Sequence, residues 1–325
     1  APSGIAWLDA WARWDGRWYV SVAESGYVDR PGEQSGLGFF PLYPLAMKLG
    51  AAPFGGDRVA LVAAGLAVSQ VALLVALIYM VRLARLDVDT ASSRRAVLYV
   101  LAYPTTIFLS AVYAESLFLA LAVMAFWYGR RGRWALAGIL SGLAALTRPF
   151  GVIVALALAA ELVSGVRSRR QVGPWAWLAI GPLALTGWIG YLFFLTGRPL
   201  AFLDAHANWS VRPGNALNAL PDLFDPRVYG FPWAVLALLL FAIVLSAYAW
   251  RLRRSYGIYS ILMLAALASP GTLTSSMRHE LGLFPAFIVL GTFGARRWVH
   301  WSYLLIGGAM SLLFGAMFAL SHWIG

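Results

Sequence analysis

The chain has 325 residues, of which 61% are hydrophobic and only 12% are charged. Soluble domains carry about 25% charged residues, so this composition excludes an ordinary soluble domain and predicts an all-α, polytopic membrane protein. The apolar runs are too long and too continuous for the alternating strands of a membrane barrel. No cysteine is present, which excludes disulfide bonds and cysteine-ligated metals.

Residues 1–56 contain no membrane span and begin with a stripe of tryptophans. The stripe has spacings of 4, 3 and 4 residues and consists of Trp7, Trp11, Trp14 and Trp18. Such spacings place side chains on one face of a helix, and tryptophan favours the headgroup layer of a membrane. The stripe therefore predicts one helix that lies in the plane of the membrane interface.

Asp15 lies inside this stripe and is followed by Gly16. We expect the glycine to weaken the helix and to let a substrate approach closely. A carboxylate held in an apolar layer is a candidate general base. The alternatives are a solvated loop acid and a salt bridge to Arg13 or Arg17.

Ten apolar runs predict the spans of a single domain, residues 1–325, with 197–231 as a second long loop. The runs cover about residues 57–81, 96–112, 116–129, 134–147, 150–166, 174–196, 232–250, 257–271, 281–295 and 300–323. These runs make ten spans. If the amino terminus is cytoplasmic, one earlier span is needed in a segment upstream of this sequence, which gives eleven.

The net charge of +11 reflects the loops and not a nucleic-acid partner. Alternate loops carry arginine clusters with a summed charge of +12, whereas all other loops sum to −1. The positive-inside rule places the arginine-rich loops in the cytoplasm. Residues 1–56 and 197–231 are therefore expected outside. Asp87 and Asp89, a short pattern of metal-dependent sugar transferases, are interpreted as solvated loop acids.

Two of the runs are too short to reach the outer membrane surface. Residues 134–147 would form a helix of about 21 Å, and 116–129 is equally short. Glu115 and Arg148 should therefore lie below that surface, facing a wet outer-leaflet cavity or a partner. Pro149 breaks the helix beside Arg148. Arg148 is expected to bind a phosphate through its fork of N–H groups, or to pair with Glu115 or Asp15.

Polar residues at other outer ends are further candidates. Arg278 and His279 could neutralise a phosphate, with Glu280 orienting the histidine; the alternative is an ordinary interfacial cap. His206 and Asn208 belong to a loop whose polar and aromatic mixture is typical of sugar binding and of exposed loops alike. No acid or histidine pair has convincing metal spacing.

Five sequence blocks, taken in order, resemble the PIG-V-like family of integral-membrane mannosyltransferases, which belongs to the GT-C superfamily. The blocks are RWDGRWYVSVAESGY at 13–27, GFFPLYPL at 38–45, YPTTIFLSAVYAESLF at 103–118, LAALTRPFGV at 143–152 and MRHELGLFPAF at 277–287. The resemblance implies transfer of a hexose, expected to be mannose, from a polyprenyl-phosphate donor to an acceptor hydroxyl, with inversion. It implies that Asp15 is the general base.

We expect Arg148, Arg278 and His279 to bind the donor phosphate. Residues of the same blocks and of the second loop are expected to bind substrate: Tyr19, Glu24, Tyr113, Glu115, Glu280, His206 and Asn208. No cofactor is predicted, and metal dependence stays open. The composition is typical of a bacterial cell membrane protein, whose acceptor would be a lipid, a glycan or a protein. The alternatives are a related enzyme for another polyprenyl-linked sugar, a lipid or sugar-lipid transporter, and a non-catalytic membrane subunit.

Overall fold

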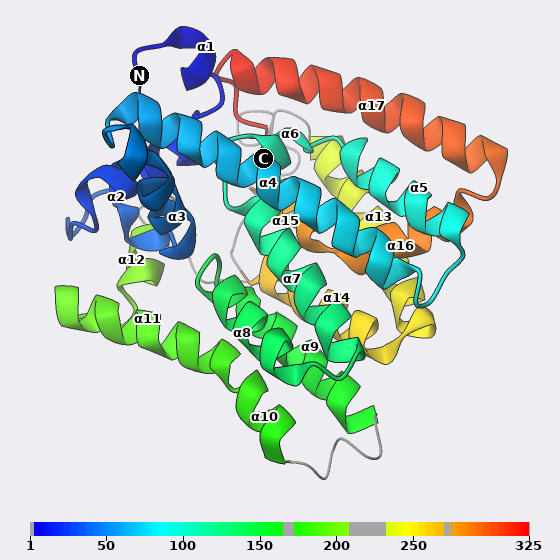
Figure 1. Cartoon of the computed structure of the whole chain (residues 1–325). Coiled ribbons are helices and arrows are strands. Elements are labelled where there is room, and N and C mark those ends of the chain that lie inside the picture. The colour runs from blue at the N-terminus through cyan, green and yellow to red at the C-terminus, as the bar shows by residue number, and fades with distance from the viewer. Residues whose placement is uncertain (1–2, 165–171, 208–231, 270–272, 274, 325) are drawn as a thin grey trace.

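The computed structural model describes residues 3–164, 172–207, 232–269, 273 and 275–324. These residues form helices and contain no strand (Figure 1), which confirms the predicted all-α class. The helices of the first half are α1 (Ala6–Asp9), α2 (Asp15–Ser25), η1 (Gly36–Gly38), α3 (Leu42–Ala51), η2 (Ala52–Phe54), α4 (Arg58–Ala84), α5 (Thr90–Leu101), α6 (Ile107–Ser110), α7 (Glu115–Arg130), α8 (Trp134–Ala145) and α9 (Gly151–Ser164). Those of the second half are α10 (Val172–Leu178), α11 (Ile180–Thr196), α12 (Ala201–Ala207), α13 (Pro232–Leu252), α14 (Arg254–Ala268), α15 (Ser276–His279), η6 (Glu280–Gly282), α16 (Phe284–Phe293) and α17 (Arg297–Ala319).

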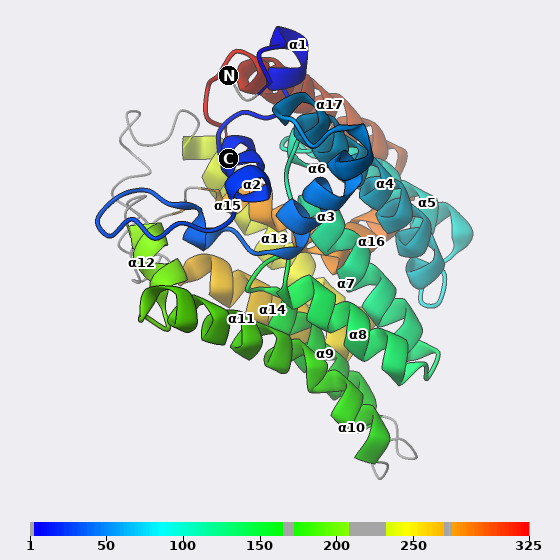
Figure 2. The same ribbon diagram turned by 60° about the vertical axis from the view of Figure 1, so that its left-hand side comes forward.

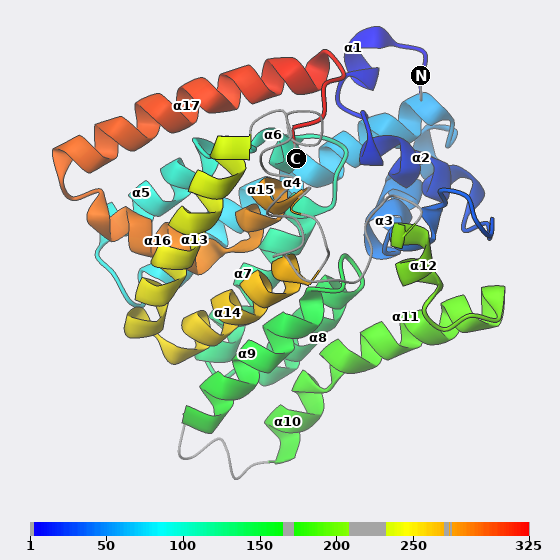
Figure 3. The same ribbon diagram turned by 180° about the vertical axis from the view of Figure 1, so that it is seen from behind.

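The short helices that precede α4 gather at one end of the bundle. In Figures 1 and 3, α2 and α3 lie beside α12, at the end where α4 begins and α11 ends. The end of α17 lies at the same end, close to α1 (Figure 2). The described parts of the two predicted outer loops therefore share one end of the molecule.

Four helical stretches among the described residues are long and apolar enough to cross a membrane. They are Arg58–Ala84, Val172–Thr196 (α10 and α11 together), Pro232–Leu252 and Arg297–Ala319. Four more apolar helices, α8, α9, α14 and α16, are shorter. The bundle thus combines long helices with the shorter ones that the sequence predicted.

The predicted span 96–112 is wrong. Helix α5 already begins at Thr90, where the Asp89 side chain accepts a hydrogen bond from Ser92 N at 2.9 Å, and it ends at Leu101. Pro104 cannot continue a helix and disfavours helical backbone at the residue before it. The chain therefore leaves α5, turns, and forms only the one-turn helix α6.

The prediction of one continuous helix for the tryptophan stripe is wrong. Helix α1 ends at Asp9, and Trp14 has a φ of 51°, in the left-handed region that interrupts a helix. Helix α2 begins directly after it, at Asp15. The break turns the chain, so that the carboxylate occupies the first turn of a new helix, where negative charge is favourable.

At the opposite end, ion pairs join the links between helices. Asp87 accepts hydrogen bonds from Arg130, from Arg253 Nε at 3.3 Å and from the Tyr256 hydroxyl at 2.9 Å. Glu161 on α9 also pairs with Arg253. Asp87 is therefore a buried structural acid and not a solvated loop residue, and the arginine-rich ends of α7 and α13 meet at one end of the bundle.

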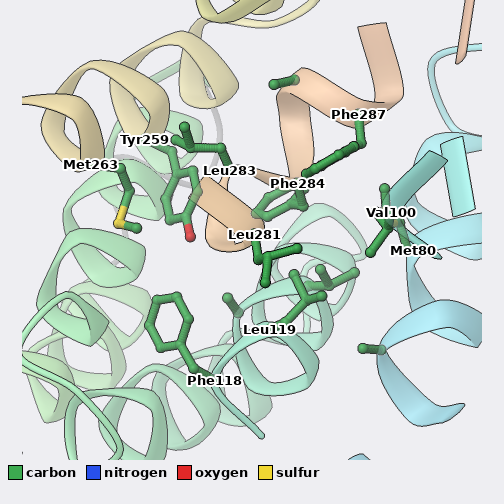
Figure 4. Packing of buried hydrophobic residues seen from close by; sticks show 14 of the residues in the cluster. Met80, Val100, Phe118, Leu119, Tyr259, Met263, Leu281, Leu283, Phe284 and Phe287 are labelled. Atoms are coloured by element: carbon green, nitrogen blue, oxygen red, sulfur yellow. The ribbon is translucent and has the colours of Figure 1, made fainter. Parts of the chain in front are cut away.

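Close packing holds the helices at fixed positions. A Cβ at Gly138 of α8 would lie 2.1 Å from Trp177 O on α10, and one at Gly291 of α16 would lie 2.4 Å from Ser92 O on α5. Small residues allow such close helix crossings in membrane proteins. Aromatic and aliphatic side chains from α7, α14, η6 and α16 fill the core between them (Figure 4). This packing fixes η6 and the turn that precedes it.

Replacing Asp87 by asparagine should destabilise the fold. Its side chain is only 7% exposed, and removing one partner of a buried ion pair costs about 3 kcal/mol or more. We expect a lower midpoint of thermal unfolding in detergent. Asp89→Asn is the matched control, because asparagine caps a helix as well as aspartate does. An equal shift in both variants would contradict the assignment.

Candidate active site

Four charged side chains from distant parts of the chain meet at the end of the bundle that carries α2 and α3. Arg278 Nη1 donates to Asp15 Oδ2 at 2.6 Å. Arg278 Nε lies 3.1 Å from Glu115 Oε1, close enough for charge attraction but outside hydrogen-bond geometry. The same Glu115 oxygen accepts a hydrogen bond from Arg148 Nη2. The ion pairs run Asp15–Arg278–Glu115–Arg148, and their formal charges cancel.

Asp15 is held in place by the turn that precedes α7. The Tyr113 hydroxyl of this turn donates to Arg13 O at 3.0 Å. A Cβ at Gly16 would lie only 3.3 Å from the carbonyl oxygen of Val112. The glycine therefore lets α2 pack closely against the turn; the close neighbour is the protein backbone, whereas a substrate was expected.

Glu115 and Arg148 stand at the ends of the two short helices. Glu115 is the first residue of α7, where a carboxylate stabilises the helix dipole. Arg148 follows the end of α8, and Pro149 prevents the helix from continuing. Arg148 was predicted to bind a phosphate or to pair with Glu115 or Asp15, and in the structure it pairs with Glu115. The pairing with Asp15 is made by Arg278 instead.

Arg278 lies on α15, a helix of only four residues whose position depends on its neighbours. Thr105 Oγ1 donates to Met277 O at 2.9 Å, and the Tyr103 hydroxyl donates to Glu280. These two bonds anchor the backbone on either side of Arg278. The segment after α5 thus sets the position of the arginine.

Three aromatic rings surround the Arg278 guanidinium. Its central carbon lies 5.4 Å from the ring centres of Phe108 and Tyr113 and 5.5 Å from that of Trp323. Cations are attracted to ring faces at such distances. The side chain of Arg278 is 8% exposed and that of Asp15 is 20% exposed, so the cluster is reached from the side of Asp15.

The two arginines keep N–H groups that no acid occupies. Arg148 Nε is buried without a hydrogen-bond partner among the residues that the structure describes. Arg278 Nη2 faces His279 Nε2 at 3.4 Å. A buried polar group without a partner is unfavourable, so these N–H groups could donate hydrogen bonds to an additional anionic ligand.

His279 adds no positive charge to the unliganded cluster. It lies in the link between α14 and α16, outside the candidate spans, with its ring 5.4 Å from that of Phe150. Burial, and then the guanidiniums of Arg148 and Arg278, lower the pKa of His279 well below its usual range. The imidazole is therefore neutral at neutral pH and can contribute hydrogen bonds only.

The two predicted tyrosines belong to the wall behind the cluster. Tyr113 is fully buried. The ring centre of Tyr19 lies 6.4 Å from that of Tyr113 and 4.9 Å from that of Tyr43. Because both are buried, their rings form part of the wall beside Asp15 and their hydroxyl groups are not exposed.

The other predicted binding residues are dispersed. Glu24 forms an exposed ion pair with Arg58 at 2.8 Å. Glu280 is 2% exposed and bonds Tyr103, so it does not orient His279 as expected. His206 Nδ1 lies 2.6 Å from Phe202 O on α12. Asn208 lies outside the described residues.

Four residues that support Arg278 were not predicted from the sequence, namely Tyr103, Thr105, Phe108 and Trp323. Tyr103 and Thr105 belong to the block around Pro104, whose helix-breaking proline could have marked them as part of a turn. Trp323 follows α17 and contacts the Trp14 ring at 5.5 Å. Nothing in the sequence connects it with a residue more than three hundred positions earlier.

Among the described residues, no three histidine, aspartate or glutamate side chains gather to hold a metal ion. An apolar groove of about 550 Å³ lies elsewhere, between leucines of α5 and α17. Its lining contains no charged residue, so it is separate from the cluster.

A family model described as mannosyltransferase (PIG-V) matches residues 5–167. The chain belongs to this family. The match contains Asp15, Glu115 and Arg148, so three of the four charges of the cluster lie within the shared part. A sequence search among curated proteins finds no match.

Solved structures with a similar fold are GT-C glycosyltransferases. ArnT from Cupriavidus metallidurans bound to undecaprenyl phosphate is 16% identical, with a TM-score of 0.56 over 94% of this chain and 61% of that one. The oligosaccharyltransferase AglB from Archaeoglobus fulgidus, with an inhibitory peptide and a dolichol phosphate, is 13% identical, with a TM-score of 0.51 over 98% of this chain and 52% of that one. The predicted GT-C fold is thus confirmed, and this chain spans only 52–61% of the length of these two neighbours.

Replacing Glu115 by glutamine should destabilise the unliganded protein. The side chain is 3% exposed and neutralises two guanidiniums that would otherwise repel each other. We expect a clearly lower midpoint of thermal unfolding, partly restored by added inorganic phosphate. Glu24→Gln, which removes an exposed pair, should leave the midpoint nearly unchanged. A Glu115→Gln protein as stable as the control would mean that the cluster does not hold these segments together.

Proposed function

We propose that the chain transfers a hexose, namely mannose, from a polyprenyl-phosphate-linked donor to an acceptor hydroxyl outside the cytoplasm, with inversion at the anomeric carbon. The observation that carries the proposal is the contact between Asp15 and Arg278, which sets a carboxylate beside one guanidinium of the cluster, while Glu115 joins that guanidinium to Arg148. Membership of the mannosyltransferase (PIG-V) family supports the sugar.

The polyprenyl donor is supported by the two neighbours that contain undecaprenyl phosphate and dolichol phosphate. Short helices lead to Glu115 and Arg148, so the cluster would lie slightly below the outer surface of the membrane. A sugar linked to a membrane lipid is held at that depth. A general base for such a donor must be held there too.

In the proposed reaction, an acceptor oxygen attacks the anomeric carbon while the bond from that carbon to the phosphate oxygen breaks. The bonding electron pair goes to the phosphate, and the acceptor proton goes to Asp15. Attack opposite the leaving group inverts the anomeric carbon. Removal of a proton by a positioned base contributes about 10²–10⁴-fold to such reactions.

The leaving phosphate needs neutralisation of charge more than it needs a proton. Arg148 and Arg278 would bind it through their unoccupied N–H groups, since guanidinium forks suit phosphate oxygens. His279 would add a neutral hydrogen bond. Tyr19 and Tyr113 would line the sugar site, and His206 lies on α12 near the same end of the molecule.

The acceptor would be a lipid, a glycan or a protein at the outer face of a bacterial cell membrane. The same site could serve another polyprenyl-linked sugar, and a comparison of donor sugars decides between them. A transporter of sugar-lipids would share the arginines but would not need the carboxylate of Asp15.

Replacing Asp15 by asparagine should abolish transfer. The amide cannot accept the acceptor proton, so turnover with polyprenyl-phosphate mannose should fall by at least about 10²–10⁴-fold. Asp57→Asn is the control, because Asp57 only caps α4 through Ala60 N. Turnover near that of the unmodified protein in Asp15→Asn would contradict the proposal and favour transport.

Residues 1–56 should face the outside of the cell. The native chain has no cysteine, so single cysteines can be labelled cleanly. Gln34 is exposed and is therefore a suitable position. Gln34→Cys should react with an impermeant reagent on intact cells, whereas Arg85→Cys should react only after permeabilisation. The reverse pattern would overturn the proposed orientation.

A further inference from the structure

We infer that Arg278 is shared between Asp15 and the donor phosphate, so that it couples the general base to the leaving group. This inference rests on the proposed function and adds a specific role for one residue. Arg278 is the only one of the two arginines in the cluster that contacts Asp15. It therefore has a role that Arg148 cannot take over.

The three nitrogens of the Arg278 guanidinium have different neighbours. Nη1 donates to Asp15 Oδ2 at 2.6 Å, and Nε lies 3.1 Å from Glu115 Oε1. Among the described residues, the neighbour of Nη2 is the neutral imidazole of His279, at 3.4 Å. The edge that carries Nη2 is thus the one that an additional anion can occupy while Nη1 stays on Asp15.

The aromatic rings of Phe108, Tyr113 and Trp323 confine this guanidinium at 5.4–5.5 Å. Bonds from Tyr103 and Thr105 fix the backbone on either side of it. Because the group is held in this way, it can bind a second anion without a large movement of its side chain. Its positive charge stays between Asp15 and the proposed phosphate position.

The movement of charge during transfer is consistent with such a shared cation. The donor phosphodiester carries one negative charge, and Asp15 carries another. When the anomeric carbon–oxygen bond breaks, its electron pair adds a negative charge to the phosphate, while the acceptor proton neutralises Asp15. Negative charge therefore moves from Asp15 to the phosphate. A guanidinium that contacts both groups stabilises it before and after the step, and no further ion has to enter the buried site.

This sharing has a consequence for lipid binding. In the unliganded protein, the negative charge of Asp15 partly neutralises the Arg278 guanidinium and so weakens its attraction for the phosphate. Asp15→Asn should therefore bind polyprenyl phosphate more tightly than the unmodified protein, although it is inactive. The gain should depend on Arg278 and not on Arg148, whose acid partner is Glu115.

The test is a double-mutant cycle of binding, with undecaprenyl phosphate as the probe and the protein in nanodiscs. We expect Asp15→Asn to tighten binding about tenfold, a coupling within the range found for charged residues in contact. With Arg278→Gln already present, the same change should alter affinity less than about twofold. With Arg148→Gln present instead, the tenfold gain should persist. Arg278→Lys, which keeps the charge and loses the fork, provides a second background if the glutamine variant does not fold.

An equal gain from Asp15→Asn in all backgrounds would reflect only the loss of a negative charge and would overturn the inference. No gain in the unmodified background would overturn it as well. Either result, with an inactive Asp15→Asn protein and a lipid-binding unmodified protein, would leave the proposed function standing. A protein that binds no undecaprenyl phosphate would contradict both.

Discussion

The pairing of buried charges at one end of the bundle is the constraint on which the rest of the structure depends. Two guanidiniums and two carboxylates lie in a mostly apolar protein, where an unpaired charge would cost several kcal/mol. The paired residues lie far apart in the sequence; Asp15 and Arg278 are separated by 263 positions. The first segment, the start of α7, the end of α8 and the turn α15 must therefore meet at one point. The short helices and the break at Trp14 are the means by which they do so.

The second ion-pair network, at the opposite end, has a different character. Asp87, Arg130, Glu161 and Arg253 bind one another and join the links between helices. Their charges also cancel, but their N–H and carboxylate groups are used for the fold. In the Asp15 cluster, by contrast, Arg148 Nε is buried and has no hydrogen-bond partner within the described part of the chain. The charges that serve the fold and those proposed for the reaction are thus separated along the bundle.

Much of this arrangement could be predicted from the sequence, because hydropathy decides where helices cross a membrane. Nine of the ten predicted spans correspond to observed helices, and the two short runs beside Glu115 and Arg148 correspond to α7 and α8. The break at Trp14, the contacts of the segment after α5 and the burial of Asp87 could not be predicted. Each depends on contacts between distant segments, such as Gly16 against Val112 or Tyr103 against Glu280. Periodicity and composition contain no information on such contacts.

The most direct measurement of the central claim, that this cluster is the reaction centre, is an experimental structure of the protein with bound undecaprenyl phosphate. The account predicts that the phosphate contacts both Arg148 and Arg278, with Nη2 of Arg278 toward a phosphate oxygen and Nη1 still on Asp15. The space for the sugar would then lie beside Asp15. A phosphate bound away from both arginines, with the ion pairs of the cluster unchanged, would contradict the account.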